Sequence, residues 1–134
     1  MKATELMIGN IVEIDGEPQR VRALTRRKVT YCSLKSPNQS KAKISDIEPI
    51  PITEELLVRN GFDDKSLGKN WFSKMRVKYC HDLYIYYDKQ HLPEHWRLII
   101  RNEEASDLSV SYIAYLHQLQ NLLNIMDIKL DFVV

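Results

Sequence analysis

The sequence has few cysteines and glycines and no long apolar run, and each absence excludes a class of protein. Its two cysteines, Cys32 and Cys80, are too few for the disulfide framework of a small secreted domain. Its four glycines stand singly, so there is no glycine-rich phosphate-binding loop. No stretch approaches the roughly 18 apolar residues of a membrane-spanning helix, and the first ten residues lack a signal-peptide core. We therefore expect a cytoplasmic protein that does not enter a membrane.

The composition is typical of a folded globular protein. The 134 residues are 44% hydrophobic and 28% charged, with a formal net charge of +1. Disordered chains have fewer apolar residues and a larger net charge. A chain of this length forms one ordinary domain or two very small ones, and it can bury a sizeable core.

A proline-punctuated joint divides the chain into two unlike halves. Pro49 and Pro51 favour extended conformations in the residues before them, so no helix is expected before Ile52. Thr53 can cap a short helix, and Gly61 can end it in the left-handed conformation. The predicted parts are a small β domain (1–48), the joint with its short helix (49–62) and an α+β unit (63–134).

Short alternating segments predict an antiparallel sheet in the first part. Residues 10–14 and 19–24 alternate apolar and polar side chains on either side of Asp15-Gly16, a dipeptide typical of tight hairpin turns. Further strands are expected near residues 28–34 and 42–47. Several short strands in fewer than about 50 residues favour a small SH3-like β-barrel, in which closure leaves few bare edges.

Positive charge is concentrated in this β domain. From residue 17 to residue 43 the one acidic residue is Glu17, and the basic residues are Arg20, Arg22, Arg26, Arg27, Lys28, Lys35, Lys41 and Lys43. This surface fits contact with a nucleic-acid backbone, with Tyr31 placed to stack on a base and the candidate contacts being Arg20, Arg22, Arg26, Arg27 and Lys28. The alternative is a solvated strand face that hinders aggregation, which the pI near 7.8 favours.

Three strands and a helix are predicted in the third part. Residues 71–79, 83–87 and 96–101 alternate in polarity and predict an antiparallel meander. Apolar residues at helical spacing predict one long helix over residues 109–126. Residues 127–134 return to period two and predict a last strand. The order βββαβ, with the helix covering the sheet, belongs to the α+β class.

Aromatic side chains gather on the predicted meander. Tyr84 and Tyr86 lie on the strand face opposite Leu83 and Ile85, so both faces of this strand are apolar. Such a strand is either sandwiched between layers or partly exposed as a partner surface. Tyr84, Tyr86 and Trp96 are therefore candidate residues for contact with a protein partner or with a second copy in a homo-oligomer.

The sequence contains no recognisable catalytic or metal-binding motif. Cys80-His81, followed by His91 and His95, comes nearest to a metal cluster, but adjacent strand residues point to opposite faces. We predict no catalytic residue, metal or cofactor, and we expect His117 to be partly exposed and Cys32 to be a small core residue. The rival interpretation is a metal-dependent or hydrolytic enzyme that uses His81, His91, His95 or His117.

Three segments spread over the chain form a further pattern. They are Glu5-Leu-Met-Ile-Gly-Asn10, Ile47-Glu-Pro-Ile-Pro-Ile-Thr53 leading to Asn60-Gly-Phe62, and Tyr115-Leu-His-Gln-Leu-Gln-Asn-Leu122. Together they resemble a family of small uncharacterised proteins common in Bacteroides-type bacteria and in their phages and mobile elements. The resemblance implies a cytoplasmic, non-enzymatic accessory protein and carries over no catalytic residue. We therefore expect a binding or adaptor module whose partner is a nucleic acid or a protein of the same element.

Overall fold

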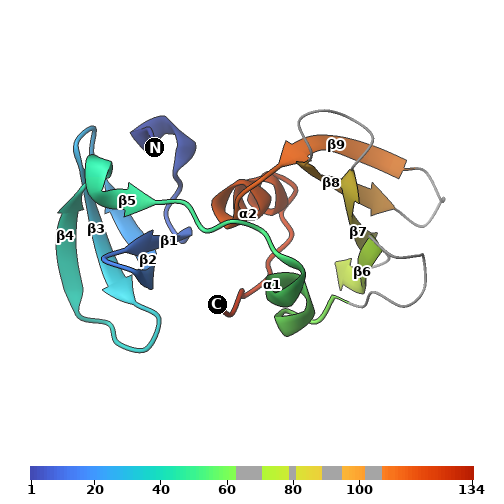
Figure 1. The fold of residues 1–134 in the computed structure, drawn as a ribbon, viewed down its shortest axis with the longest axis horizontal. Helices are drawn as coiled ribbons and strands as arrows, with labels where there is room; N and C mark the ends of the chain where they lie inside the picture. The colour runs from blue at the N-terminus through green and yellow to red at the C-terminus, as the bar shows by residue number, and fades with distance from the viewer. Residues whose placement is uncertain (63–70, 79–80, 89–94, 102–106) are drawn as a thin grey trace. The chain divides into compact units, whose positions relative to one another are not determined.

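A computed structural model of the chain describes residues 1–62, 71–78, 81–88, 95–101 and 107–134 (Figure 1). At positions 71, 75–78, 81, 88, 95 and 107–111 the description covers the backbone alone. The chain forms two compact units, residues 1–51 with 115–122 and residues 52–114 with 123–134. Each contains an antiparallel sheet, and helices are few, so the α+β class is confirmed. The division into the three predicted parts stays a prediction.

The first unit contains a five-stranded sheet. In the order β4-β3-β2-β1-β5 its strands are Gln39–Lys43, Lys28–Ser33, Glu17–Leu24, Ile11–Ile14 and Ile47–Glu48. The predicted hairpin is confirmed, because Ile14 pairs with Glu17 across the Asp15-Gly16 turn. Both turn residues have left-handed φ angles, 54° and 78°, as a two-residue hairpin of type I′ requires.

The path from β4 to β5 shows that this sheet is curled. The two strands lie at opposite ends of the sheet, yet only a short 3₁₀ helix, Ile44–Asp46, connects them. Four Cα–Cα steps span at most about 15 Å, whereas the end strands of a flat five-stranded sheet lie about 19 Å apart. The 3₁₀ helix interrupts the extended backbone here, so the single strand predicted at 42–47 is wrong. No pairing of β4 with β5 is found in the described part of the chain, and the SH3-like barrel stays a prediction.

One face of the first sheet forms an apolar core. Its buried residues are Leu6, Val12, Ile14, Val21, Val29, Ile44 and Ile47, with Met1, Ala3, Leu24, Tyr31 and Ala42 packed against them. Leu6 enters this core directly after the 3₁₀ helix Ala3–Glu5. Cys32 is buried as well, which confirms its prediction as a small core residue.

The joint forms the short capped helix that its sequence predicts. Helix α1 spans Glu54–Arg59, and the Thr53 hydroxyl accepts a hydrogen bond from the Leu56 amide at 3.1 Å. Gly61 has a φ of 83°, and the Phe62 amide closes the helix end by donating to the Leu57 carbonyl at 3.0 Å. Before the helix, Pro51 forms an isolated antiparallel bridge with Tyr115.

The second unit contains a four-stranded sheet in the order of the sequence. Its strands are β6 (Trp71–Lys78), β7 (His81–Asp88), β8 (His95–Arg101) and β9 (Asp107–Ile113). The first three confirm the predicted meander. Six of its side chains are at most 2% exposed and form the centre of the core: Phe72, Leu83, Ile85, Leu98, Ile100 and Ile113.

Two predictions for the C-terminal part are wrong. Helix α2 spans Leu116–Ile125, and residues 107–113 form strand β9, which pairs Leu108 with Ile100 and Val110 with Leu98. The segment 108–113 is rich in β-branched and aromatic residues, and pairing with β8 outweighs the helical spacing that includes Ile113. Residues 127–134 join no described strand, so the βββαβ order is replaced by four strands and a helix.

Candidate functional site

The tip of the β2–β3 hairpin presents two arginines to solvent. Thr25 closes the turn, because its amide donates to the Lys28 carbonyl at 2.9 Å and its hydroxyl accepts from the Lys28 amide at 3.1 Å. Arg26 and Arg27 lie inside this loop, and both are exposed. The Arg27 carbonyl accepts from the Ile44 amide at 2.9 Å, so the loop is also bonded to the 3₁₀ helix that follows β4.

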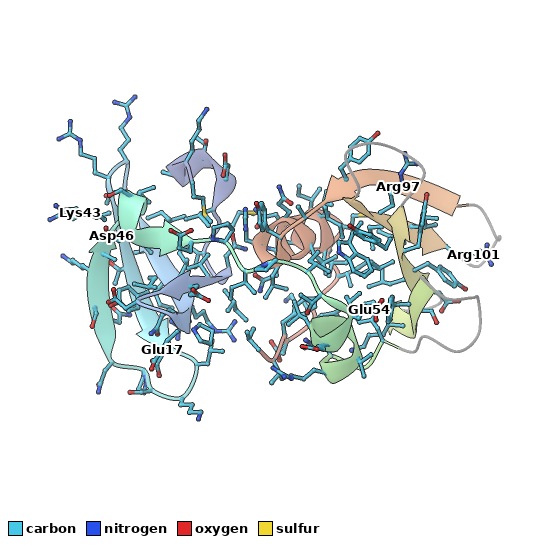
Figure 2. All side chains as sticks on the ribbon, viewed as in Figure 1. Glu17, Lys43, Asp46, Glu54, Arg97 and Arg101 are labelled. Atoms are coloured by element: carbon cyan, nitrogen blue, oxygen red, sulfur yellow. The ribbon has the colours of Figure 1, made fainter. Side chains whose placement is uncertain are left out.

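Lysines on the adjoining strands extend this positive surface. Lys28 lies directly opposite Lys43, and Thr30 lies opposite Lys41, so the three lysines share one sheet face. All three are exposed, and Figure 2 shows Lys43 projecting outward from β4. We call the set the basic rim: Arg26, Arg27, Lys28, Lys41 and Lys43. Among the described residues, the side chains of these five form no salt bridge or hydrogen bond.

The other predicted nucleic-acid contacts lie around the rim in different environments. Arg22 is exposed at a bulge where the β2–β3 register shifts between Val21 and Ala23. Arg20 is half-buried, with its Nη1 3.5 Å from the Gly9 carbonyl oxygen. Tyr31 is half-buried and packs against the apolar core. Because strand side chains alternate, its ring lies on the sheet face opposite Lys28.

The aromatic residues predicted for protein contact belong largely to the second unit's interior. Trp96 is 8% exposed, and its ring lies 5.8 Å from that of Phe72 and 5.0 Å from that of Tyr87. Tyr84 is 7% exposed, with the Arg101 guanidinium 5.1 Å from its ring centroid. Tyr86 is half-buried. Tyr84 and Trp96 thus offer little accessible surface.

Side-chain amides bind the first half of helix α2 to the loop before β1. Asn10 Nδ2 donates to Asn121 Oδ1 at 2.8 Å, and Asn121 Nδ2 donates to the Glu5 carbonyl at 2.9 Å. Gln120 Oε1 accepts from the Ile11 amide at 2.9 Å. Two segments that carry the sequence resemblance, 5–10 and 115–122, are therefore hydrogen-bonded to each other.

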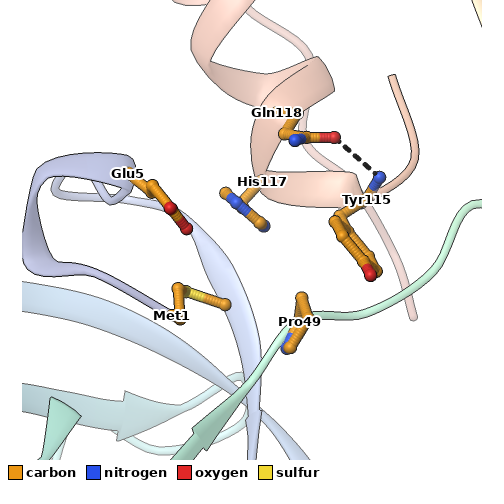
Figure 3. A pocket seen from close by; sticks show the side chains of 6 residues that line it. All are labelled: Met1, Glu5, Pro49, Tyr115, His117 and Gln118. Atoms are coloured by element: carbon orange, nitrogen blue, oxygen red, sulfur yellow. Dashed lines mark hydrogen bonds between the residues drawn. The ribbon is translucent and has the colours of Figure 1, made fainter. Parts of the chain in front are cut away.

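The same face of α2 carries a buried histidine beside a cavity. His117 precedes Asn121 by one helical turn and is 2% exposed, so its predicted partial exposure is wrong. The cavity, of about 350 Å³, is lined by Met1, Glu5, Pro49, Tyr115, His117 and Gln118 (Figure 3). The Tyr115 ring stacks on the His117 ring at 5.9 Å and 12°.

The electrostatics of the cavity are dominated by burial. Removal from water lowers the pKa of His117 below 6.5, which outweighs the upward effect of the Glu5 carboxylate; the Met1 α-amino group contributes a smaller downward effect. The imidazole is therefore neutral near pH 7. Its Nδ1 is buried and has no hydrogen-bond partner among the described residues.

The described residues contain no group of three histidine, cysteine or acidic side chains placed to hold a metal ion. Cys80 and His91 lie outside the described residues, and His81 and His95 are described by their backbone alone. Of the four histidines in the enzyme interpretation, His117 is therefore the one whose side chain the structure describes.

The chain matches no protein-family model, no curated protein and no solved structure. Among the helices that the structure describes, none combines the length and the apolar character needed to cross a membrane. Interpretation of the site therefore depends on its own chemistry.

The basic residues were predicted from the sequence. The cavity beside His117 and the hydrogen bonds of Asn10, Asn121 and Gln120 were not. Asn10, Asn121 and Gln120 are polar residues in turns or helices, which are ordinarily solvated. The one available signal was helical spacing: His117, Gln120 and Asn121 lie on one face of α2, next to the stripe of Leu116, Leu119 and Leu123.

Proposed function

We propose that this chain is a non-enzymatic binding module that contacts the phosphate backbone of a nucleic acid through the basic rim. The observation that carries the proposal is the cross-strand pair Lys28–Lys43 beside the Arg26-Arg27 tip. All four residues are exposed, and their side chains form no salt bridge with any described residue. Like charges directly opposite on neighbouring strands destabilise a sheet. An anionic backbone relieves this repulsion and releases its condensed counterions.

The scarcity of acidic residues around the basic rim supports the rim as the site of nucleic-acid contact. Asp46 follows Lys43 by three residues, but no acidic residue lies on β3 or β4. The aromatic surface is a weaker candidate for a protein partner or a second copy, because Tyr84 and Trp96 are buried. With the resemblance described above, the proposed partner is a nucleic acid handled by a phage or mobile element.

Binding to a fluorescent duplex and to a single strand, measured between 50 and 200 mM salt, tests the proposal. Five phosphate contacts predict a logarithmic salt slope of about −4 to −5 on duplex DNA. The double variant Arg26→Glu/Arg27→Glu should weaken binding at least tenfold and reduce the slope by about 2.

The matched control is Arg59→Glu/Lys129→Glu, which makes the same charge change at exposed positions of the second unit. It should bind nearly as tightly as the unaltered chain. Absence of salt-sensitive binding by the unaltered chain, or equal losses in both double variants, contradicts the proposal.

A further inference from the structure

The cavity beside His117 has the composition of a small-ligand site. Its volume of about 350 Å³ falls within the roughly 300–1,000 Å³ of ligand pockets. Met1 and Pro49 provide apolar walls, while Glu5, Gln118 and His117 provide polar groups. Figure 3 shows the His117 ring pointing between Glu5 and Tyr115 into this space. All six lining residues belong to the first unit.

The buried imidazole is the strongest indication of a ligand. A buried polar atom without a hydrogen-bond partner costs about 1–3 kcal/mol, and His117 Nδ1 has no partner among the described residues. The ring is neutral at pH 7 because burial lowers its pKa. A neutral imidazole has one donor and one acceptor nitrogen, so Nδ1 can either donate to or accept from an uncharged ligand, depending on the tautomer.

The walls specify the shape and charge of that ligand. Tyr115 is 37% exposed, and its ring lies nearly parallel to the His117 ring, which favours a flat, aromatic ligand. Glu5 is the one charged side chain among the lining residues. Its carboxylate accepts hydrogen bonds, so it favours a ligand edge with N–H donors. The Gln118 Oε1 is already bonded to the Tyr115 amide at 3.1 Å.

We propose that this cavity binds an unpaired nucleobase that carries an exocyclic amino group. Its ring would lie against Tyr115, its amino group would donate to the Glu5 carboxylate, and His117 would bond its ring edge. Adenine, cytosine and guanine carry such an amino group; uracil and thymine have carbonyl oxygens in its place. The base comes either from a free nucleoside or from a nucleotide of a bound strand. Only the second source rests on the proposed nucleic-acid function.

Nuclear magnetic resonance of the His117 ring nitrogens in the full chain tests the cavity directly. Adenosine and cytidine should shift these resonances in a saturable way, whereas uridine and thymidine should bind at least tenfold more weakly. Glu5→Gln should weaken adenosine binding about tenfold, and Glu48→Gln, at an exposed carboxylate of the same unit, should not. Equal binding of all four nucleosides, or no shift with any, overturns the inference.

The His117→Phe variant keeps a ring in place and removes both nitrogens, so it should abolish nucleoside binding. Circular dichroism checks its fold, and Glu5→Gln tests the site if that variant does not fold. Agmatine serves as a cationic probe without an aromatic base. If it binds more tightly than adenosine, the cavity recognises organic cations and the nucleobase assignment is wrong.

Oligonucleotides separate this inference from the proposed function. If the base comes from a strand, oligo-dA should bind better than oligo-dT, and His117→Phe should remove that preference without changing the salt slope. If only free nucleosides use the cavity, they should bind Arg26→Glu/Arg27→Glu as they bind the unaltered chain. Salt-dependent strand binding without any nucleoside effect would leave the rim proposal standing and end the cavity proposal.

Discussion

The side-chain amide of Asn60 forms two hydrogen bonds with the backbone of Val133. Its Oδ1 accepts from the Val133 amide at 2.7 Å, and its Nδ2 donates to the Val133 carbonyl at 2.8 Å. Nδ2 also donates to the Leu56 carbonyl at 2.8 Å, and the Asn60 carbonyl accepts from Lys74 Nζ at 2.8 Å. One buried residue thus joins helix α1, strand β6 and the C-terminal segment, which takes a side-chain partner instead of a neighbouring strand.

Replacing Asn60 should destabilise the protein strongly. Asn60→Ala removes three side-chain hydrogen bonds at a residue that is 8% exposed. We expect the free energy of unfolding to fall by about 2–4 kcal/mol, because the bonded groups lose their partners. Urea unfolding measures this change. Asn124→Ala, at an exposed position of α2, is the control and should change stability by less than about 0.5 kcal/mol. A loss below about 1 kcal/mol for Asn60→Ala would refute this role.

Asn10 and Asn121 should be energetically coupled. Their amides share a 2.8 Å hydrogen bond, and Asn10 Oδ1 also accepts from the Met7 amide at 2.8 Å. Each alanine variant should lose about 1–3 kcal/mol of stability, and a double-mutant cycle should give a coupling of about 1 kcal/mol. The cycle of Asn10 with Asn60, which lies in the other unit, should be additive. Additivity for both pairs would contradict the direct bond.

His117 should make stability depend on pH in mildly acidic solution. Burial lowers its native pKa below 6.5, so the unfolded chain binds the additional proton first as the pH falls. The free energy of unfolding should therefore decline below about pH 6.5, level off below the native pKa, and show no contribution from His117 above pH 6.5. Subtracting the His117→Phe profile isolates this effect from the other histidines. Parallel profiles would contradict the lowered pKa.

Gly61 should tolerate alanine poorly because of its backbone conformation. Its φ is 83°, and an added Cβ would lie 3.5 Å from Lys74 Nζ, an ordinary contact. The cost of Gly61→Ala should therefore come from the left-handed backbone and amount to about 1 kcal/mol in urea unfolding. Gly61→Asn adds a larger side chain but tolerates this conformation better, so it should cost less. The reverse order would indicate steric crowding.

Features formed by neighbouring residues were predictable. The Asp15-Gly16 hairpin and the helix capped by Thr53 and ended by Gly61 occur where expected, because turns and caps depend on the hydrogen bonds and φ angles of a few residues. The meander of the second unit was also predictable from a local pattern. Strict alternation marks one buried and one solvated face whatever the neighbouring strand.

The wrong predictions concern segments that could pack or pair in more than one way. Residues 109–113 satisfy both a helical spacing and a strand pattern, and pairing with β8 selects the strand. Residues 127–134 alternate like a strand, but Val133 is bonded to Asn60 instead. His117 was expected to be partly exposed, but it is buried beside a cavity that Glu5 and Pro49 also line.

The amino-acid sequence alone determined the α+β class, the proline joint, the local turns and caps, and the concentration of basic residues between 20 and 43, because these depend on composition and on interactions within a few residues. Three features became visible only in the folded chain: Lys28 lies opposite Lys43, Asn60 is hydrogen-bonded to the C-terminal segment, and His117 is buried beside a cavity. These relationships join residues far apart in the chain, and burial and hydrogen bonding act through space once the whole chain has packed.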